Sequence, residues 1–438
     1  MYDPALLEPV FYRWGIPLQG THFLVALSGG LDSIVLAQSM ANLAGRHDFA
    51  VTLGHVNHHL RPEADREQAF CREFSARLGL PFRAVALDPG QRKGESVEAW
   101  ARRERYAALE RLRQEARAQW ILTAHHADDQ AETVLMRLIQ QAPLLSLAGI
   151  RPRRDRVLRP LLSFTRQQLR AWAKSEALEW VEDPSNADRR FLRNRLRHGV
   201  MAAMMAEDEN TRETLLGLAR LARGYESRCA AAARDLAGLA SEGNLPETVD
   251  MPVEALLAVE EDIFKLAVRS VVERFLGIHI QLSTPHWQNF RHFVRVGTVG
   301  KVFDLPGSVQ ALLDRGRLIF YYSGQASAPE RRPLEPGKTR WGYHDFMVTP
   351  TDHPAEVTGL WLRSWWSGDR ARVAPGRRSR LVSDIYVDAR LSRLEKTHWP
   401  LVVTRQDEVV WLPGLGTPRN YLVKAPWRIA WQTQIRKR

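Results

Sequence analysis

Short apolar runs alternate with longer amphipathic segments through the first part of the chain. The apolar runs predict strands at 22–27, 49–56, 81–87 and 120–124. Apolar residues repeat at helical spacing in the segments that follow, which predict helices at 33–44, 65–78, 96–117 and 127–139. Four strand–helix units in succession predict a doubly wound parallel α/β sheet with right-handed crossovers. Such a sheet binds its ligands at the carboxyl ends of the strands.

The pattern changes after Arg197. Alanine- and leucine-rich segments at 201–239 and 254–276 predict helices, whereas strand-like runs begin after Gly300 and include 302–305, 316–322, 401–404 and 409–412. Two polar, Pro-containing segments, 243–252 and 326–338, predict linkers. We therefore expect three domains: an α/β domain at 1–215, a mainly helical or mixed domain at 216–335, and a small α+β domain at 336–438.

Composition restricts the possible partners and compartments. Lys and Arg number 62 against 50 Asp and Glu, a formal net charge of +12, which favours a polyanionic partner such as nucleic acid or a membrane surface. The only cysteines, Cys71 and Cys229, form no C-x-x-C pair, which argues against a disulfide framework, a zinc ribbon and an iron–sulfur cluster. No apolar segment is long enough to span a membrane and no signal peptide is evident, so we expect a cytoplasmic protein without membrane contact.

The first strand leads into the sequence SGGLDS, Ser28 to Ser33, at the predicted start of a helix. Glycines let the backbone curl around an anion, and free N–H groups at a helix N-terminus attract phosphate. Asp32 would need a cation between itself and a phosphate, which suggests Mg²⁺. A simple helix cap after a tight turn would explain the two glycines alone, but the full S-G-G-x-D-S string favours phosphate binding.

This string resembles the pyrophosphatase-type loop of the PP-loop superfamily, whose members activate an oxygen of their substrate with AMP and release pyrophosphate. The resemblance implies a PP-loop, Rossmann-like fold that binds ATP and Mg²⁺, with Asp32 as metal ligand. It assigns nucleotide binding to the loop residues Ser28, Gly29, Gly30, Leu31, Asp32 and Ser33.

Two further segments connect the chain to one family within this superfamily. HVNHHLRP, residues 55–62, follows the second strand; its three histidines are a weak metal signal, or simply a polar loop. The segment is similar to one typical of tRNA(Ile)-lysidine synthetases. EAWARRERY, residues 98–106, places Arg102 and Arg105 three residues apart on a helix, which by itself indicates a solvated face. The resemblance implies instead that Arg105 contacts the nucleotide and Arg102 the lysine.

LTAHHADDQAET, residues 122–133, is very close to the lysidine synthetase motif at the end of the fourth strand. Asp129 and Glu132 are three residues apart, so both carboxylates can share one helix face and hold the ammonium group of a free lysine. Acidic residues at a helix N-terminus are also common without any ligand. One of His125, Asp129 and Glu132 could remove the proton from lysine, and the sequence leaves open which.

Basic segments farther along resemble the family's tRNA-binding regions. EDPSNADRRFLRNRLR, residues 182–197, contains Arg193, Asn194 and Arg197. Residues 363–380 contain Arg370, Arg377 and Arg378 near three tryptophans, Trp361, Trp365 and Trp366, which could stack on RNA bases or belong to a core. The resemblance implies that these arginines and Asn194 bind tRNA.

One segment departs from the family pattern. Residues 140–150 read QQAPLLSLAGI, and Gln141, Pro143 and Ser146 stand where the family usually has glycines. This substitution puts the handling of lysine or tRNA in doubt, but not the adenylation chemistry.

The resemblance implies an ATP-dependent carbon–nitrogen ligase that joins L-lysine to C2 of the wobble cytidine of a CAU-anticodon tRNA(Ile), by way of an adenylated intermediate. Its catalytic residues would be Asp32, His125, Asp129 and Glu132. A homodimer remains open. The alternatives are another PP-loop tRNA-modifying enzyme, such as a 2-thiolase, or a catalytically altered paralogue, and the cysteines match no thiolase motif.

Overall fold

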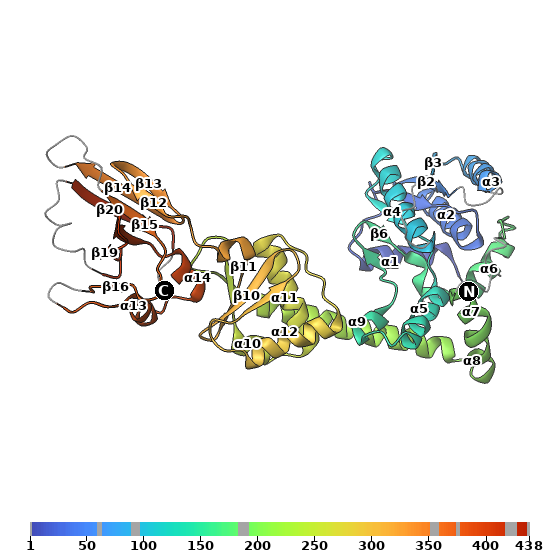
Figure 1. Ribbon diagram of the computed structural model, residues 1–438. Helices are drawn as coiled ribbons and strands as arrows, with labels where there is room; N and C mark the ends of the chain where they lie inside the picture. Colours follow the sequence, from blue (N-terminus) through green and yellow to red (C-terminus); the bar gives the residue numbers. More distant parts are fainter. Residues whose placement is uncertain are drawn as a thin grey trace. The chain divides into compact units, whose positions relative to one another are not determined.

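The computed structural model describes residues 2–58, 64–88, 97–182, 192–350, 359–373, 377–416 and 427–435 (Figure 1). The chain divides into an N-terminal unit, Met1–Glu226, and a C-terminal unit, Ser227–Arg438. Within the described residues, no helix combines the length and apolar character needed to cross a membrane.

The N-terminal unit is built on one sheet with the strand order β3-β2-β1-β4-β6-β5. The parallel strands are β1 (His22–Ala26), β2 (Ala50–Asn57), β3 (Phe82–Ala86), β4 (Trp120–Leu122) and β6 (Val157–Leu158). Only β5 (Arg153–Arg154) is antiparallel. The predicted doubly wound parallel sheet is confirmed. The sheet also contains β5 and β6, which were not predicted because strands of two residues are too short to show a hydrophobic pattern.

Helices cover both faces of this sheet because alternate residues of β1 point in opposite directions. Phe23 and Val25 join the core that includes α2, whereas Leu24 packs with Leu109 and Leu112 of α4. The helices of the unit are α1 (Glu8–Arg13), α2 (Leu31–Ala44), α3 (Ala64–Arg77), α4 (Val97–Glu115), α5 (Ala127–Ile139), α6 (Arg166–Ser175), α7 (Leu192–Arg195), the π-helix η6 (Leu196–Met201), α8 (Ala202–Glu207) and the first part of α9 (Thr211–Ala237).

The strand order reverses between β1 and β4. The chain moves outward from β1 to β2 and β3, and then returns to the other side of β1 with β4. A crevice forms outside the carboxyl ends of the strands at such a reversal. The loop after β1 and the loop after β4 both open there, so the SGGLDS and HHADD segments meet although about 95 residues separate them in the sequence.

Segment 140–150 is attached to α5 by the buried side chain of Gln130 and by Arg137, which donates to the carbonyl of Ser146. The side chain of Gln130 donates to the carbonyl of Ala148 (3.0 Å) and accepts from the N–H of Ile150 (2.6 Å). Gly149 lies between them with φ +72°, and a Cβ there would come within 2.3 Å of the Gln130 amide. The glycine-poor segment thus keeps a glycine at the position where backbone conformation and close approach both require one.

The C-terminal unit contains a five-stranded antiparallel sheet, ordered β7-β8-β11-β10-β9, with helices packed against it. Its strands are β7 (Ser241–Glu242), β8 (Val249–Pro252), β9 (Val302–Leu305), β10 (Val309–Asp314) and β11 (Arg317–Tyr322), and its helices are α10 (Val253–Leu257), α11 (Glu261–Leu276) and α12 (Thr284–Val296). The predicted linker 243–252 is wrong, because β8 pairs with β11 and places Met251 in the core.

The rest of this unit consists of small antiparallel sheets and two short helices. The first sheet has the strand order β12 (Arg332–Leu334), β15 (Leu360–Arg363), β18 (Leu401–Thr404), β19 (Val409–Trp411). The second has the order β13 (Gly337–Trp341), β14 (His344–Pro350), β20 (Trp427–Thr433), and the third pairs β16 (Arg370–Ala371) with β17 (Arg380–Leu381). The two helices are α13 (Val382–Asp388) and α14 (Arg393–His398). The linker predicted at 326–338 is also wrong, since it contains β12 and the start of β13. The three domain limits expected from sequence stay a prediction.

Candidate active site

A cavity of about 870 Å³ opens at the carboxyl ends of β1, β2 and β4. Its walls come from the loop after β1, the end of β2, one face of α4, the start of α5, and the α7–η6 segment. Of the site residues predicted from sequence, those that line it are Ser28, Gly30, Leu31, Asp32, Ser33, Arg105, His125, Asp129, Arg193, Asn194 and Arg197.

The loop Ser28–Ser33 is held in shape by its own hydroxyls. Ser33 Oγ donates to the carbonyl of Gly30 (2.9 Å) and accepts from both the N–H and the hydroxyl of Ser28 (3.1 Å each). Gly29 has φ +86°, a conformation that glycine adopts readily. The loop enters α2 directly, and the first N–H groups of a helix are a ready anion site.

Asp32 has an oxygen available for a cation. Its Oδ1 is buried without a hydrogen-bond partner, and its Oδ2 lies 3.6 Å from Nε2 of His126. Magnesium is commonly bound by one or two carboxylates together with substrate phosphates, so this carboxylate beside a phosphate loop fits Mg²⁺. No cluster of three or more His, Cys, Asp or Glu suited to a metal occurs among the residues the structure describes, so a protein-only metal cage is not formed by them.

His126 joins the two loops, a role that the sequence did not reveal. It is the N-cap of α5 and is almost fully buried, and its Nδ1 accepts from the N–H of Asp129 (3.3 Å). Its Nε2 therefore faces the carboxylates of Asp32 (3.6 Å) and Asp129 (3.5 Å). Burial lowers the pKa of His126, but the surrounding carboxylates outweigh burial and raise the pKa overall.

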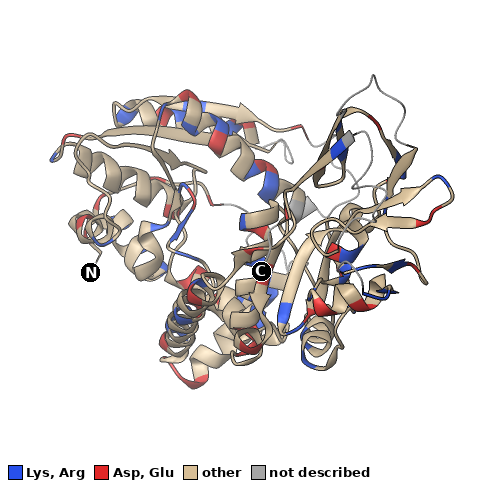
Figure 2. Ribbon diagram, turned by 90° about the vertical axis from the view of Figure 1, so that its left-hand side faces the viewer, with Lys and Arg blue, Asp and Glu red and all other residues tan. Residues whose placement is uncertain are grey.

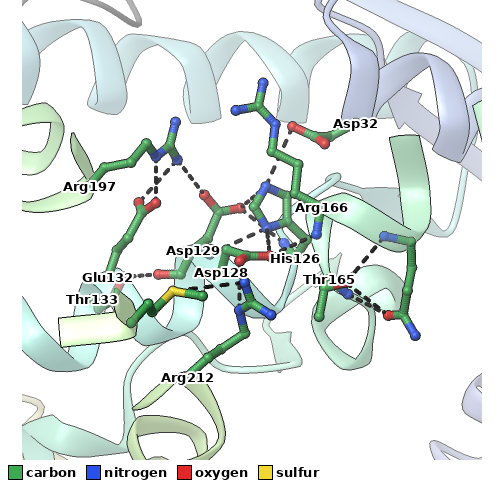
Figure 3. A network of polar contacts seen from close by, with 12 residues as sticks. Asp32, His126, Asp128, Asp129, Glu132, Thr133, Thr165, Arg166, Arg197 and Arg212 are labelled. Atoms are coloured by element: carbon green, nitrogen blue, oxygen red, sulfur yellow. Dashed lines mark hydrogen bonds and ion pairs between the residues drawn. The ribbon is translucent and has the colours of Figure 1, made fainter. Parts of the chain in front are cut away.

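The acidic pair on α5 is matched by two arginines from the α7–η6 segment, Arg193 and Arg197. Figure 3 shows Arg197 beside Asp129 and Glu132. Arg193 donates to Asp129 (2.6 Å) and to Glu132 (2.8 Å). Arg197 donates to Glu132 through Nε (2.5 Å) and Nη2 (3.1 Å). Both arginines were expected to face tRNA; in this structure they neutralise the two carboxylates expected to bind lysine. The side chain of Glu132 is only 5% exposed, which makes these partners necessary.

The candidate proton acceptors differ in charge. Burial raises the pKa of Asp129, but the charges of His126 and Arg193 lower it by more than burial raises it. The net shift of the pKa is downward, so the group is a carboxylate. Burial first, and then nearby arginines, lower the pKa of His125 to about 4, although Asp129 acts in the opposite direction. His125 is thus a neutral imidazole at physiological pH, and its Nδ1 lies 3.0 Å from the hydroxyl of Thr123.

The two arginines predicted on α4 have different positions relative to the cavity. Arg105 lines the cavity and donates to Nε2 of His58 (3.3 Å). Arg102 is exposed, is not part of the cavity lining, and lies over the ring of Tyr106 at 5.4 Å. His55 bonds through Nδ1 to the carbonyl of Leu27 (2.9 Å), so it supports the strand that leads into the phosphate loop.

Other predicted residues lie elsewhere or outside the description. Arg370, Arg377 and Arg378 belong to the C-terminal unit and are exposed, in or beside β16 and β17. Residues 59–63 and 183–191, which include His59 and most of the EDPSNADRRF segment, lie outside the described residues. Basic and acidic residues are interspersed over the elements of both units (Figure 2).

Both cysteines are buried, and one supports the phosphate loop. A Cβ on Gly29 would be 3.4 Å from Sγ of Cys71. Burial raises the pKa of Cys71 to about 12, so its thiol is protonated and unreactive. Cys229 is buried within α9 and is also a free cysteine.

Comparisons with known proteins agree with this geometry. A model of the PP-loop domain matches residues 9–204, and a model of the TilS substrate C-terminal domain matches residues 360–431. The chain is 40% identical to the tRNA(Ile)-lysidine synthase of Alkalilimnicola ehrlichii, over 93% of this chain and 92% of the relative. It is 30% identical to that of Symbiobacterium thermophilum, over 97% of this chain and 96% of the relative.

Among solved structures, the chain is similar to the U34-tRNA thiolase NcsA from Methanococcus maripaludis, with 16% identity, a TM-score of 0.42, and coverage of 50% of this chain and 78% of that one. This likeness is too distant to bear on function.

We predict that Glu132 and Arg197 are strongly coupled. In a double-mutant cycle of Glu132→Gln and Arg197→Gln, the coupling free energy of unfolding should be about 1–3 kcal/mol, because each single change removes one partner of a buried ion pair, although Arg193 still contacts Glu132 when Arg197 is replaced. Urea denaturation of the N-terminal unit measures it. The exposed pair Arg77–Glu179 is the matched control and should couple by less than about 0.5 kcal/mol. Equal coupling in both pairs would contradict the structure.

A second prediction concerns pH. The folded-state pKa of His125 lies below its ordinary value of 6.5, so only the unfolded chain binds this proton between about pH 6.5 and pH 4, and stability falls as pH drops through that window. Between pH 7 and pH 5 the native chain should lose about 1–2 kcal/mol more unfolding free energy than His125→Gln. Parallel pH dependence of the two proteins would show that His125 titrates normally.

Proposed function

The chain belongs to the tRNA(Ile)-lysidine synthase family of ATP-using tRNA-modifying enzymes, and on that premise we propose that it ligates L-lysine to C2 of the wobble cytidine in a CAU-anticodon tRNA(Ile). The C2 oxygen attacks the α-phosphate of ATP and pyrophosphate leaves. The ε-amine of lysine then attacks C2, AMP leaves, and the amine gives up its proton. Mg²⁺ as cofactor, a homodimeric assembly and a cytoplasmic location are also part of this proposal.

One observation carries the proposal: the phosphate loop and the buried carboxylate of Asp129 line one cavity, whereas Glu132, three residues farther along α5, does not line it. The loop Ser28–Ser33 suits the phosphates of ATP, and Asp129 at the start of α5 suits a cationic substrate. An enzyme that only hydrolysed ATP would need no acidic pair, and an amino-acid-binding protein would need no phosphate loop. Their meeting at one crevice fits a reaction that joins an activated group to an amine.

Asp32 is the residue that would hold Mg²⁺, because its Oδ1 is buried, unpaired, and next to the phosphate loop. A bound Mg²⁺ would neutralise charge on the leaving pyrophosphate. Around it, the chain contributes N–H groups at the start of α2 and the guanidinium of Arg105, which lines the same cavity. His126 fixes the orientation of Asp32 through its Nε2.

Asp129 and Glu132 form the proposed lysine site, and their charge is already balanced by Arg193 and Arg197. A lysine ammonium therefore brings an additional positive charge to a neutral cluster. Bound ATP supplies the compensating negative charge on the other wall of the same cavity. We propose that nucleotide binds first and strengthens the binding of lysine.

His125 is the proposed proton acceptor for the attacking amine. Asp129 and Glu132 are each engaged by an arginine, whereas His125 is neutral and lines the cavity beside them. A pKa of about 4 makes His125 a weak base in the free protein. Negative charge from bound nucleotide would raise that pKa toward the range where proton transfer is effective.

We predict lysine incorporation that depends on the wobble base. Purified protein with ATP, Mg²⁺ and labelled lysine should label a CAU-anticodon tRNA(Ile) transcript in a form that survives mild base, and should not label the same tRNA with U at the wobble position.

Asp32→Asn should lower the rate of lysine incorporation by at least about tenfold, with partial recovery at high Mg²⁺, because one metal ligand is weakened.

The control for that variant is Asp155→Asn, because Asp155 lies in the turn between β5 and β6, its side chain is exposed, and it does not line the cavity. It should retain the native rate. Labelling of both tRNAs, or label removed by mild base, would contradict lysidine formation, and an unchanged rate in Asp32→Asn would contradict the metal role.

A further inference from the structure

The three tryptophans near the basic segment 363–380 have different environments. Trp365 packs edge-on against Tyr386, with 6.0 Å between the ring centroids, in a core of the C-terminal unit. Trp361 is partly buried in the same core, and the guanidinium of Arg331 lies 4.6 Å from its ring centroid. Trp366 is 52% exposed. Only this last ring offers a large free surface.

The ring of Trp366 is held in place from beneath. The guanidinium of Arg363 lies 3.8 Å from its centroid, and this arginine side chain is only 3% exposed. Arg363 is itself fixed by ion pairs with Asp369 (2.8 Å) and Asp407 (3.1 Å). The backbone N–H of Trp366 donates to the carboxylate of Asp369 (2.5 Å), so the ring and its support share one anchor.

This arrangement differs from that of an ordinary exposed hydrophobic side chain. Three polar residues, Arg363, Asp369 and Asp407, order one indole that is half exposed, although an exposed tryptophan contributes little to folding. A rigid aromatic face that is already ordered loses little conformational entropy when a flat ligand stacks on it. The cation on the inner face leaves the outer face available.

The surroundings indicate which flat ligand fits. Asp369 leads directly into the β16–β17 hairpin, where Arg370 pairs with Leu381 and donates to the carbonyl of Ser379 (2.8 Å). The exposed arginines in or beside this hairpin are Arg370, Arg372, Arg377, Arg378 and Arg380. An aromatic face flanked by several exposed arginines matches the combination of stacking and phosphate contact by which proteins bind unpaired nucleotides.

We propose that Trp366 is a stacking platform for one unpaired or helix-terminal base of the tRNA, with phosphates next to that base held by the hairpin arginines. The proposal rests on the proposed function, which supplies the tRNA, and adds a specific contact in the C-terminal unit. Arg363 is a positioning residue: it touches the ring and not the RNA.

The test measures binding of fluorescently labelled, unmodified CAU-anticodon tRNA(Ile) to the full-length protein at several salt concentrations. Trp366→Ala should raise Kd about tenfold, the loss expected for one stacked base, and leave the slope of log Kd against log salt unchanged. Trp366→Phe should stay within about threefold of the native value, because it keeps an aromatic face. Arg378→Gln should reduce the slope by about one phosphate contact.

Val387→Ala is the matched control, since Val387 is 59% exposed on α13 and lies outside the hairpin. It should bind tRNA like the native protein. A native Kd for Trp366→Ala, a loss as large in Trp366→Phe as in Trp366→Ala, or a changed salt slope in Trp366→Ala would each overturn the stacking role.

Thermal unfolding of the variants shows whether a loss of affinity comes from loss of folding. A Trp366→Ala variant with native stability and weakened tRNA binding supports the stacking platform. If Trp366→Ala unfolds, a Trp366→Phe variant that folds and binds tRNA supports it instead. The two proposals fail separately: protein that binds tRNA through Trp366 but forms no lysidine contradicts the proposed function alone. Protein that forms lysidine while Trp366→Ala binds normally contradicts only the stacking platform.

Discussion

The active-site cavity depends on pairing two buried carboxylates with cations. Asp129 and Glu132 lie one helical turn apart and largely out of water, where a carboxylate costs folding free energy unless a cation contacts it. The cations are Arg193 and Arg197, which come from more than 60 residues farther along the chain. Their ion pairs attach the α7–η6 segment to α5, so the same interaction that satisfies the acids also builds one wall of the cavity.

The opposite wall is determined by the sheet. Because strand order reverses between β1 and β4, the phosphate loop and the start of α5 open into the same crevice, and His126 links Asp32 on one side to Asp129 on the other. The two loops are therefore joined electrostatically as well as spatially. The acid–arginine cluster is neutral by itself, so under the proposed function the charge of the nucleotide becomes part of the lysine site.

Local patterns revealed most of the first domain. β1 to β4 are mostly apolar runs, α5 has the predicted limits Ala127–Ile139, and the SGGLDS loop is a short segment whose chemistry is read from its own residues. Long-range partnership was not visible, because nothing near Arg193 indicates that it pairs with Asp129. Arg102 was assigned to lysine by the family resemblance, whereas its helical spacing indicated the exposed position that the structure shows. Both segments taken as linkers contain strands. β12 and β13 are edge strands, where Pro and polar residues are tolerated, whereas β8 lies between β7 and β11 and is held by long-range pairing.

The most direct test of this account is calorimetric titration of L-lysine into the full-length protein, with and without a non-hydrolysable ATP analogue and Mg²⁺. The account predicts that nucleotide tightens lysine binding at least about tenfold, and that Asp129→Asn removes most of this gain, because the added negative charge offsets the third cation. Equal lysine affinity with and without nucleotide would contradict it, and so would a gain that survives in Asp129→Asn.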